Sequence, residues 1–267
     1  MEDQKKRQVA YHEAEVYSAR TPREADNSNP LIAWLNGYRL RTVIGIIGTP
    51  LSGKTVLSVC GGDGEEAQYL RRRGAAVTIV DLCASAVEAA RLRSPEPCCL
   101  CMDAESLAFA DASFDWAIVR EGLHHLARPV KALYELERVS REGFAIMEGQ
   151  DSLLVRLLVA LGLGEDWDPA GGYVYRFSRR EIHKIFSSVE TLSRWRLHTA
   201  WLPFGSDALR YCPAIRCVYP VVNRPWVRRI LTSRAGRRSL KALYRGLNLV
   251  AGRWGNCLIA VAWKKPL

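Results

Sequence analysis

The sequence predicts an α/β fold with a mostly parallel, seven-stranded sheet and a helical cap. From Val56 onward, short apolar segments alternate with segments of helical periodicity, which is typical of a parallel sheet covered by helices. The chain has 267 residues, 48% hydrophobic and 25% charged, so it can bury a sizeable core and is not of a disordered, collagen-like or coiled-coil class. No apolar stretch reaches the ~20 residues that a bilayer span needs. With no secretory signal either, the expected compartment is the cytoplasm.

The expected elements follow in chain order. The first 45 residues are polar and helix-prone, and should form a helical lid that includes Leu31, Trp34, Leu35 and Tyr38 at helical spacing. Strands are expected at residues 56–60, 76–80, 98–102, 115–119, 143–147, 191–201 and 256–263. Helices are expected at residues 65–73, 84–92, 129–139, 152–163 and 178–186. This divides the chain into a lid (1–45), a ligand-binding core (46–151) and a remainder (152–267) that carries the last strands and an inserted cap at about 205–254.

Positive charge is concentrated in the C-terminal part of the chain. The net charge is +10, but residues 1–150 carry −3 and residues 151–267 carry +13. Residues 208–255 contain eleven Lys or Arg and no acidic residue, and such a block attracts phosphate, anionic lipid or an acidic substrate. Within it, residues 224–253 have the pattern of a basic amphipathic helix. Two interpretations stay open: a cap helix on the core, or a surface that contacts anionic membrane.

Two motifs that suggest other chemistry are set aside. Residues 48–55 match the phosphate-loop pattern G-x-x-x-x-G-K-T, but that loop must open a helix, and a strand follows Lys54. We interpret residues 50–54 as the turn that leads into this strand. Among eight cysteines, Cys98 and Cys101 form one C-x2-C spacing with no second pair, so we expect neither a metal site nor a disulfide framework.

The glycine-rich loop after the first strand predicts a ligand site. Gly62-x-Gly64-x-x-Ala67 fits the dinucleotide fingerprint, and its strand-to-helix context is right. However, Glu65 and Glu66 would place two carboxylates beside a pyrophosphate, which costs on the order of a kcal/mol each. The loop therefore favours a ligand without phosphate.

The same loop resembles motif I of the class I S-adenosylmethionine-dependent methyltransferases of small-molecule type. The likeness lies in Val56-Leu57-Ser58-Val59-Cys60-Gly61-Gly62-Asp63-Gly64, and residues 77–82, 101–107, 114–119 and 121–126 are similar to the segments that follow in that family. It spans about residues 50 to 150. The resemblance implies a Rossmann-like fold, S-adenosylmethionine as cofactor, and transfer of a methyl group to a small molecule. The basic C-terminal block leaves open an acidic or lipidic acceptor. Two positions depart from the family, which usually has an acid at Ser58 and a glycine at Cys60.

The resemblance also implies which residues contact the cofactor. They are Cys60, Gly61, Gly62, Asp81, Leu82, Asp103, Ala104 and Arg120. The glycines let the backbone approach the methionine part, Asp81 suits the ribose hydroxyls, and Asp103 suits the adenine amino group. The backbone N–H of Ala104 suits a ring nitrogen, and Arg120 the methionine part.

His124 and His125 are the candidate catalytic bases, because they follow the fourth strand at the edge where such sheets bind ligands. The alternative is that the pair only packs against the next helix. Glu121, Glu148 and Asp151 lie at neighbouring strand ends. Tyr11, His12 and Tyr17 are candidates for a lid over the cofactor.

Two other functions remain open from the sequence. The basic C-terminal region is compatible with an RNA methyltransferase, although Asn/Asp-Pro-Pro-aromatic and catalytic-cysteine signatures are absent, so nucleic acid is not the expected partner. The deviations at Ser58 and Cys60 are compatible with a fold that binds S-adenosylmethionine without catalysis.

Overall fold

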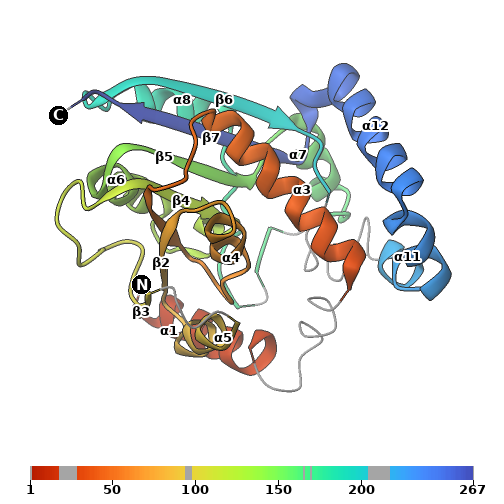
Figure 1. Cartoon of the computed structure of the whole chain (residues 1–267), viewed down its shortest axis with the longest axis horizontal. Coiled ribbons are helices and arrows are strands. Elements are labelled where there is room, and N and C mark those ends of the chain that lie inside the picture. Colours follow the sequence, from red (N-terminus) through yellow and green to blue (C-terminus); the bar gives the residue numbers. More distant parts are fainter. Residues whose placement is uncertain are drawn as a thin grey trace.

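The computed structural model describes residues 2–17, 29–93, 98–164, 166–168, 170–203 and 217–266. Its centre is a seven-stranded sheet in the order β3-β2-β1-β4-β5-β7-β6 (Figure 1). The strands are β1 (Thr55–Val59), β2 (Ala76–Asp81), β3 (Cys98–Cys101), β4 (Phe114–Arg120), β5 (Ser140–Gly149), β6 (Leu192–Ala200) and β7 (Cys257–Lys264). β1 to β5 pair in parallel, whereas β7 is antiparallel to β5 and β6. The predicted mostly parallel sheet of seven strands is confirmed, and every strand overlaps its predicted range.

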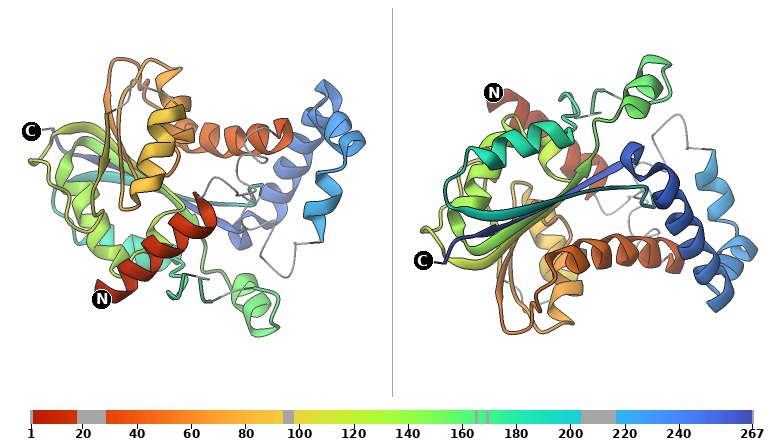
Figure 2. Two further views of the ribbon diagram at one scale, coloured as in Figure 1. Left: turned by 90° about the horizontal axis from the view of Figure 1, so that it is seen from below. Right: turned by 90° about the horizontal axis from the view of Figure 1, so that it is seen from above.

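Helices cover both faces of this sheet (Figure 2). α3 (Pro30–Ile47), α4 (Glu65–Arg71) and α5 (Ala84–Arg93) pack on one face, and α6 (Pro129–Val139) and α8 (Arg179–Ser187) pack on the other. Leu57 and Val59 of β1 pack toward α6 and α8, whereas Val56 packs toward α3, α4 and α5. Because both faces are buried, the central strands are continuous apolar runs without polar alternation.

The strand order sets the position of a ligand site. The chain winds from β1 to β2 and β3 on one side, and β4 and β5 lie on the other side of β1. In open parallel sheets, ligands bind where this order reverses, outside the carboxyl ends of the strands. The glycine loop after β1 and the histidines after β4 both lie at this point.

The expected lid boundary at residue 45 needs correction. α3 begins after Asn29, whose side chain caps Leu31 N, and it ends at Gly48, which has a left-handed φ of 71°. Val43 and Ile47 of α3 are buried in the core against the sheet. Before α3, the described part of the chain forms α1 (Glu2–Tyr11) and the π-helix η1 (His12–Val16).

The C-terminal insertion forms α10 (Val218–Val222), α11 (Pro225–Thr232), α12 (Arg234–Ala251) and the 3-10 helix η3 (Gly252–Trp254). These helices pack beside the far end of α3, where the rings of Tyr38 and Tyr244 lie 6.0 Å apart (Figure 1). The single helix expected over residues 224–253 is two helices, because Ser233 takes an extended conformation and caps α12. A shorter helix, α7 (Leu153–Ala160), follows β5.

The turn predicted before the first strand is confirmed. Lys54 N donates to Leu51 O, and β1 begins at the next residue, so Lys54 does not open a helix. The Lys54 side chain pairs with Glu142 on β5. No helix in the described ranges is both long and apolar enough to cross a membrane.

Candidate functional site

The glycine loop between β1 and α4 turns tightly at Cys60, Gly61 and Gly62. Cys60 and Gly62 both have a left-handed φ of 52°. A Cβ built on Gly61 would lie 2.7 Å from Ile79 Cγ2, so only glycine fits this approach to β2. The conformation of Cys60 gives a physical reason for the glycine that the family usually has there.

Asp81, the last residue of β2, holds this loop in place. Its Oδ2 accepts a hydrogen bond from Gly62 N at 2.9 Å, and its Oδ1 accepts one from Cys83 N at 2.9 Å. Each carboxylate oxygen keeps acceptor capacity beyond one bond, so Asp81 can also accept from ribose hydroxyls. Leu82 follows it, half-buried, with its carbonyl oxygen 3.2 Å from Cys101 Sγ.

Asp103 lies after β3 and is held by a residue that the sequence analysis missed. Lys5 Nζ of α1 lies 2.6 Å from Asp103 Oδ2 and 2.8 Å from Glu105 Oε2. Burial by itself lowers the pKa of Lys5, but hydrogen bonds to both carboxylates outweigh it and raise the pKa. Asp103 Oδ1 accepts from Glu105 N, and Ala104 between them is buried. No local pattern signals Lys5, because 98 residues separate it from Asp103.

The N-terminal segment contacts the site at two further points. A Cβ on Gly62 would lie 2.8 Å from the Tyr17 hydroxyl, which places Tyr17 over the glycine loop. The His12 ring of η1 stacks edge-on against His125, with centroids 5.1 Å apart. α1 and the segment after it therefore extend from Asp103 past His125 to the glycine loop.

Arg120, which was expected beside the methionine part of the cofactor, binds the first turn of α4 instead. Its Nη2 lies 3.2 Å from Glu65 Oε2, and its Nε lies 3.5 Å from Glu66 Oε2. Ser58 donates a hydrogen bond of 3.0 Å to the buried Glu66. Burial raises the pKa of Glu66, although Arg120 and Ser58 oppose the shift. An acid at position 58 would face Glu66 directly, which accounts for the serine.

His124 belongs to a buried hydrogen-bond network around Glu148. Glu148 Oε1 accepts from Gly122 N and Leu123 N at 2.8 and 2.7 Å, and its Oε2 lies 2.8 Å from His124 Nδ1. Burial by itself lowers the pKa of His124, but Glu148 outweighs it, so the pKa is raised. Glu148 thereby connects the end of β5 to the 3-10 helix η2 (Leu123–His125).

His125 pairs with Asp168, which no motif in the sequence marks. Its Nδ1 lies 2.7 Å from Asp168 Oδ2. Burial and the neighbouring His124, whose ring centroid is 4.0 Å away, lower the pKa of His125, while Asp168 opposes the shift. Although burial alone raises it, the pKa of Asp168 is lowered to about 2 by its close contact and charge interaction with His125. An ionised carboxylate therefore lies beside His125, in a close approach and not in an aligned hydrogen bond, because His125 Nδ1 has no hydrogen-bond partner among the described residues.

A second ion pair, between a buried arginine and a partly exposed glutamate, lies at the end of β4. Arg39 of α3 is 3% exposed, and its Nη2 donates to Glu121 Oε1. Among the described residues, Arg39 Nε and Nη1 have no hydrogen-bond partner. Burial by itself raises the pKa of Glu121, but Arg39 lowers it below its usual value. Glu121 also has a strained φ of 54°, a feature that clusters at functional sites.

These residues fit S-adenosylmethionine in donor chemistry. The loop turns tightly, since a Cβ on Gly61 would meet Ile79 and one on Gly62 would meet the Tyr17 hydroxyl, and carboxylates stand at the carboxyl ends of β2 and β3. Within the described ranges, no group of three or more His, Cys, Asp or Glu is arranged to hold a metal ion. Asp151, another candidate, instead pairs with the exposed Arg156.

A family model described as "Methyltransferase domain" matches residues 57–147, from β1 to β5, with the glycine loop and the Asp81 and Asp103 positions inside it. The chain therefore contains a methyltransferase domain over residues 57–147. The methyltransferase is 26% identical over 174 residues to the demethylmenaquinone methyltransferase of Renibacterium salmoninarum, covering 60% of this chain and 71% of that one. It is 33% identical over 106 residues to the ubiquinone/menaquinone biosynthesis C-methyltransferase UbiE of Roseobacter denitrificans, covering 37% of this chain and 42% of that one.

Solved structures agree on the fold of the methyltransferase. The YcgJ protein of Bacillus subtilis superposes with a TM-score of 0.55 at 19% identity, covering 86% of this chain and 98% of the other. Magnesium protoporphyrin IX methyltransferase from Synechocystis PCC 6803, solved with bound SAH, gives a TM-score of 0.51 at 15% identity, covering 85% and 83%. At these identities the likeness concerns the fold alone.

Proposed function

We propose that this methyltransferase transfers the methyl group of S-adenosylmethionine to a small, apolar acceptor with an ionisable hydroxyl, and that His125 is the general base. The observation that carries the proposal is the His125–Asp168 pair at the carboxyl edge of the sheet, beside the glycine loop. The similarity to two demethylmenaquinone methyltransferases supports this acceptor class, because demethylmenaquinone is a quinone.

The cofactor would be held by residues from three strand ends. Cys60, Gly61 and Gly62 would border its methionine part, Asp81 with the adjacent Leu82 the ribose, and Asp103 with Ala104 the adenine. The cofactor supplies an electrophilic methyl group on a sulfonium. In this proposal Arg120 positions α4 through Glu65 and Glu66 and does not touch the cofactor.

The chain's own contribution is to orient the acceptor and remove its proton. Because Nδ1 of His125 faces Asp168, its Nε2 is the atom free to accept a proton. Removal of the hydroxyl proton raises the electron density of the oxygen and of the ring carbon beside it, either of which can then take the methyl group. His124, held by Glu148, positions η2. The raised pKa of His124 favours its protonated form, and a positive charge on His124 disfavours protonation of His125.

Arg39 suits the anion that this deprotonation creates. Two of its buried nitrogen donors have no partner among the described residues, and its third nitrogen donates to Glu121. A buried arginine with unused donors binds an oxyanion strongly, because the guanidinium is already removed from water in the folded protein. An anionic small-molecule acceptor would therefore use this arginine, and no nucleic-acid substrate is needed to explain it.

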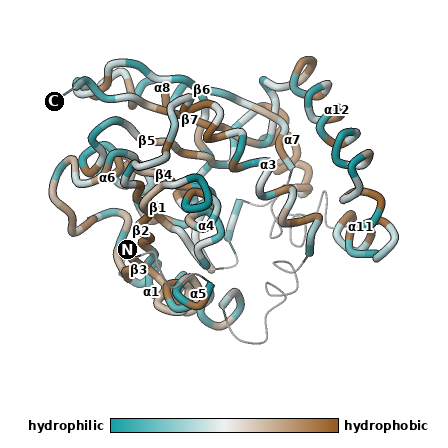
Figure 3. The backbone as a smooth tube through the Cα atoms, viewed as in Figure 1, coloured by the Kyte–Doolittle hydropathy of each residue, from teal (hydrophilic) through white to brown (hydrophobic). Residues whose placement is uncertain are grey.

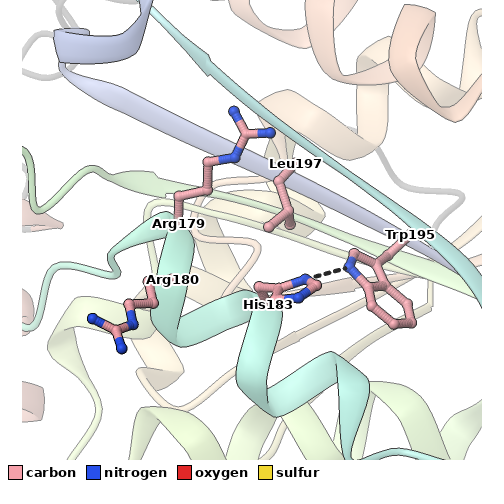
Figure 4. A pocket seen from close by; sticks show the side chains of 5 residues that line it. All are labelled: Arg179, Arg180, His183, Trp195 and Leu197. Carbon is pink, nitrogen blue, oxygen red and sulfur yellow. Dashed lines mark hydrogen bonds between the residues drawn. The ribbon is translucent and has the colours of Figure 1, made fainter.

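The test is methyl transfer to a reduced demethylated quinone from labelled S-adenosylmethionine. General-base catalysis contributes about 10²- to 10⁴-fold, so His125→Gln should lower kcat by that factor while cofactor affinity stays within about twofold. Asp168→Asn should lower kcat in the same direction, because the imidazole loses the partner that fixes its tautomer. His183→Gln is the matched control, because His183 lies on α8, where Trp195 Nε1 donates to its ring (Figure 4), and it is not part of the His125–Asp168 pair. Unchanged turnover of His125→Gln would contradict the assignment.

A further inference from the structure

The helix α7 is apolar yet uncovered. Its eight residues read Leu-Leu-Val-Arg-Leu-Leu-Val-Ala, and none of them is buried. Leu157 is 54% exposed, and Leu161, one turn later at the end of the helix, is 63% exposed. The helix is nevertheless properly formed, because the Ser152 side chain caps Val155 N. Water is an unfavourable environment for such a surface, which therefore marks an interaction site.

α12 combines a second apolar stripe with dense positive charge. Leu243, Leu247 and Val250 are exposed at i, i+4 and i+7, so they share one side of the helix. The helix alternates between hydrophobic and hydrophilic residues along its length (Figure 3). The exposed cations of α11, α12 and η3 and the segment before them are Arg224, Arg229, Arg234, Arg237, Arg238, Lys241, Arg245 and Arg253. Within the described ranges no carboxylate pairs with any of these eight.

A pocket of about 500 Å³ connects α7 to the basic helices. It is lined by Gln150, Ser152, Leu153, Arg179, Thr199, Arg253 and Trp254. Neither arginine has a carboxylate partner in the described part of the chain, and the buried Gln150 Oε1 has no partner there either. Arg179 also borders a second open hollow of about 480 Å³, formed with Arg180 on α8 (Figure 4). The pocket thus offers two unpaired guanidinium groups next to exposed apolar side chains.

α7 and the end of the basic helices at η3 lie at the same edge of the sheet as the glycine loop and His125. α7 follows the carboxyl end of β5, and η3 precedes β7, which is antiparallel, so both lie at the carboxyl edge of the sheet (Figures 1 and 2). α7 and η3 are in contact. Asp168, the partner of His125, follows α7 along the chain. We call α7, α12, η3 and the pocket between them the docking surface.

We propose that the docking surface binds an anionic lipid bilayer, with a lipid phosphate between Arg179 and Arg253. Charge complementarity favours this partner, because the cations carry no internal counter-charge. A second copy of the chain is disfavoured, since a symmetric contact would bring cations against cations. Nucleic acid is disfavoured because leucines and valines would gain nothing from a sugar-phosphate backbone. Docking would bring the membrane beside His125, where a lipidic acceptor could enter, but the proposal holds for any acceptor.

The experiment is co-sedimentation of the full chain with vesicles, without cofactor or acceptor. Neutral phosphatidylcholine vesicles are compared with vesicles containing about one third phosphatidylglycerol, each at about 50 mM and about 500 mM salt. Binding should require the anionic lipid and should fall at high salt. Arg237→Glu with Arg238→Glu should lower affinity at least about 25-fold, since each cation near a charged membrane contributes about fivefold. Leu157→Glu with Leu161→Glu should lower it tenfold or more.

Matched controls lie on other surfaces. Leu92→Glu changes a leucine that is 79% exposed on α5, and Arg72→Glu changes an exposed arginine at the end of α4; both should bind as the wild type does. Negligible binding to both vesicle types would overturn the proposal. So would a dimer that the leucine variants abolish, or a short RNA that displaces anionic vesicles from the protein. Methyl transfer to an acceptor kept in solution is assayed separately, so failure of docking is distinguishable from failure of the proposed function.

Discussion

Gly122 and Cys60 form a tightly coupled pair at the mouth of the site. A Cβ built on Gly122 would lie 2.3 Å from Cys60 Cβ and 3.0 Å from its Sγ. Carbon atoms pack at about 3.5–4.0 Å, so Gly122→Ala forces a displacement of more than about 1 Å. Such overpacking costs about 1–3 kcal/mol of unfolding free energy.

The cost should depend on the side chain at position 60. Cys60→Gly removes the obstacle and relieves the left-handed φ of 52°, worth about 1–2 kcal/mol, against about 1 kcal/mol for the lost partly buried side chain. Cys60→Gly alone should therefore be nearly neutral. In that background Gly122→Ala should cost no more than about 0.5 kcal/mol, because the clash is absent.

Urea unfolding of the wild type, Gly122→Ala, Cys60→Gly and the double variant measures this coupling. The double variant should be about 1–2 kcal/mol more stable than the sum of the two single effects predicts. Thermal unfolding gives a parallel reading, at roughly 2–4 °C for each kcal/mol in a protein of this size. If Gly122→Ala destabilises the protein equally in both backgrounds, the steric reasoning is refuted.

Four further predictions concern the site. Asp81→Ala should weaken S-adenosylmethionine tenfold or more in calorimetry and should also destabilise the fold, because two backbone amides lose their acceptor; unchanged affinity would contradict the ribose assignment. Lys54→Ala should leave cofactor affinity unchanged, and ATP should not bind in the same titration, because a strand follows Lys54. Glu148→Ala should cost about 3–5 kcal/mol in urea unfolding, since it leaves two buried amides and a histidine without a partner; a loss below about 1 kcal/mol would count against the network. Burial and His124 lower the pKa of His125 from its usual value, so kcat should stay constant around neutral pH and decrease only at acidic pH, as the base is protonated; a decrease beginning above pH 7 would exclude His125.

The structure explains the two departures from the family pattern. Ser58 stands beside Glu66, a buried carboxylate from α4, so an acid at both positions would place two like charges in contact. Cys60 is accommodated because Gly122 leaves room for its side chain. Each departure is thus matched by a residue elsewhere in the chain, which supports a working cofactor loop.

The sequence alone determined the sheet and the loop that follows its first strand. Apolar runs such as Val56–Val59 mark central strands because a strand buried on both faces has no polar alternation. The tight turn at Gly61 and Gly62 and the acid at Asp81 are equally local, since a strand end and a glycine conformation are set by neighbouring residues. The phosphate-loop match was excluded by local context in the same way.

The tertiary structure decided which distant side chains meet. Asp168 reaches His125, and Lys5 reaches Asp103, across long sequence separations that no periodicity encodes. The exposure of α7 was equally invisible, because its sequence reads as that of a core helix and only the packing of its neighbours leaves it uncovered. Burial and pairing depend on the positions of all elements together, whereas secondary structure depends mainly on adjacent residues, and this physical difference separates what could be predicted from what could not.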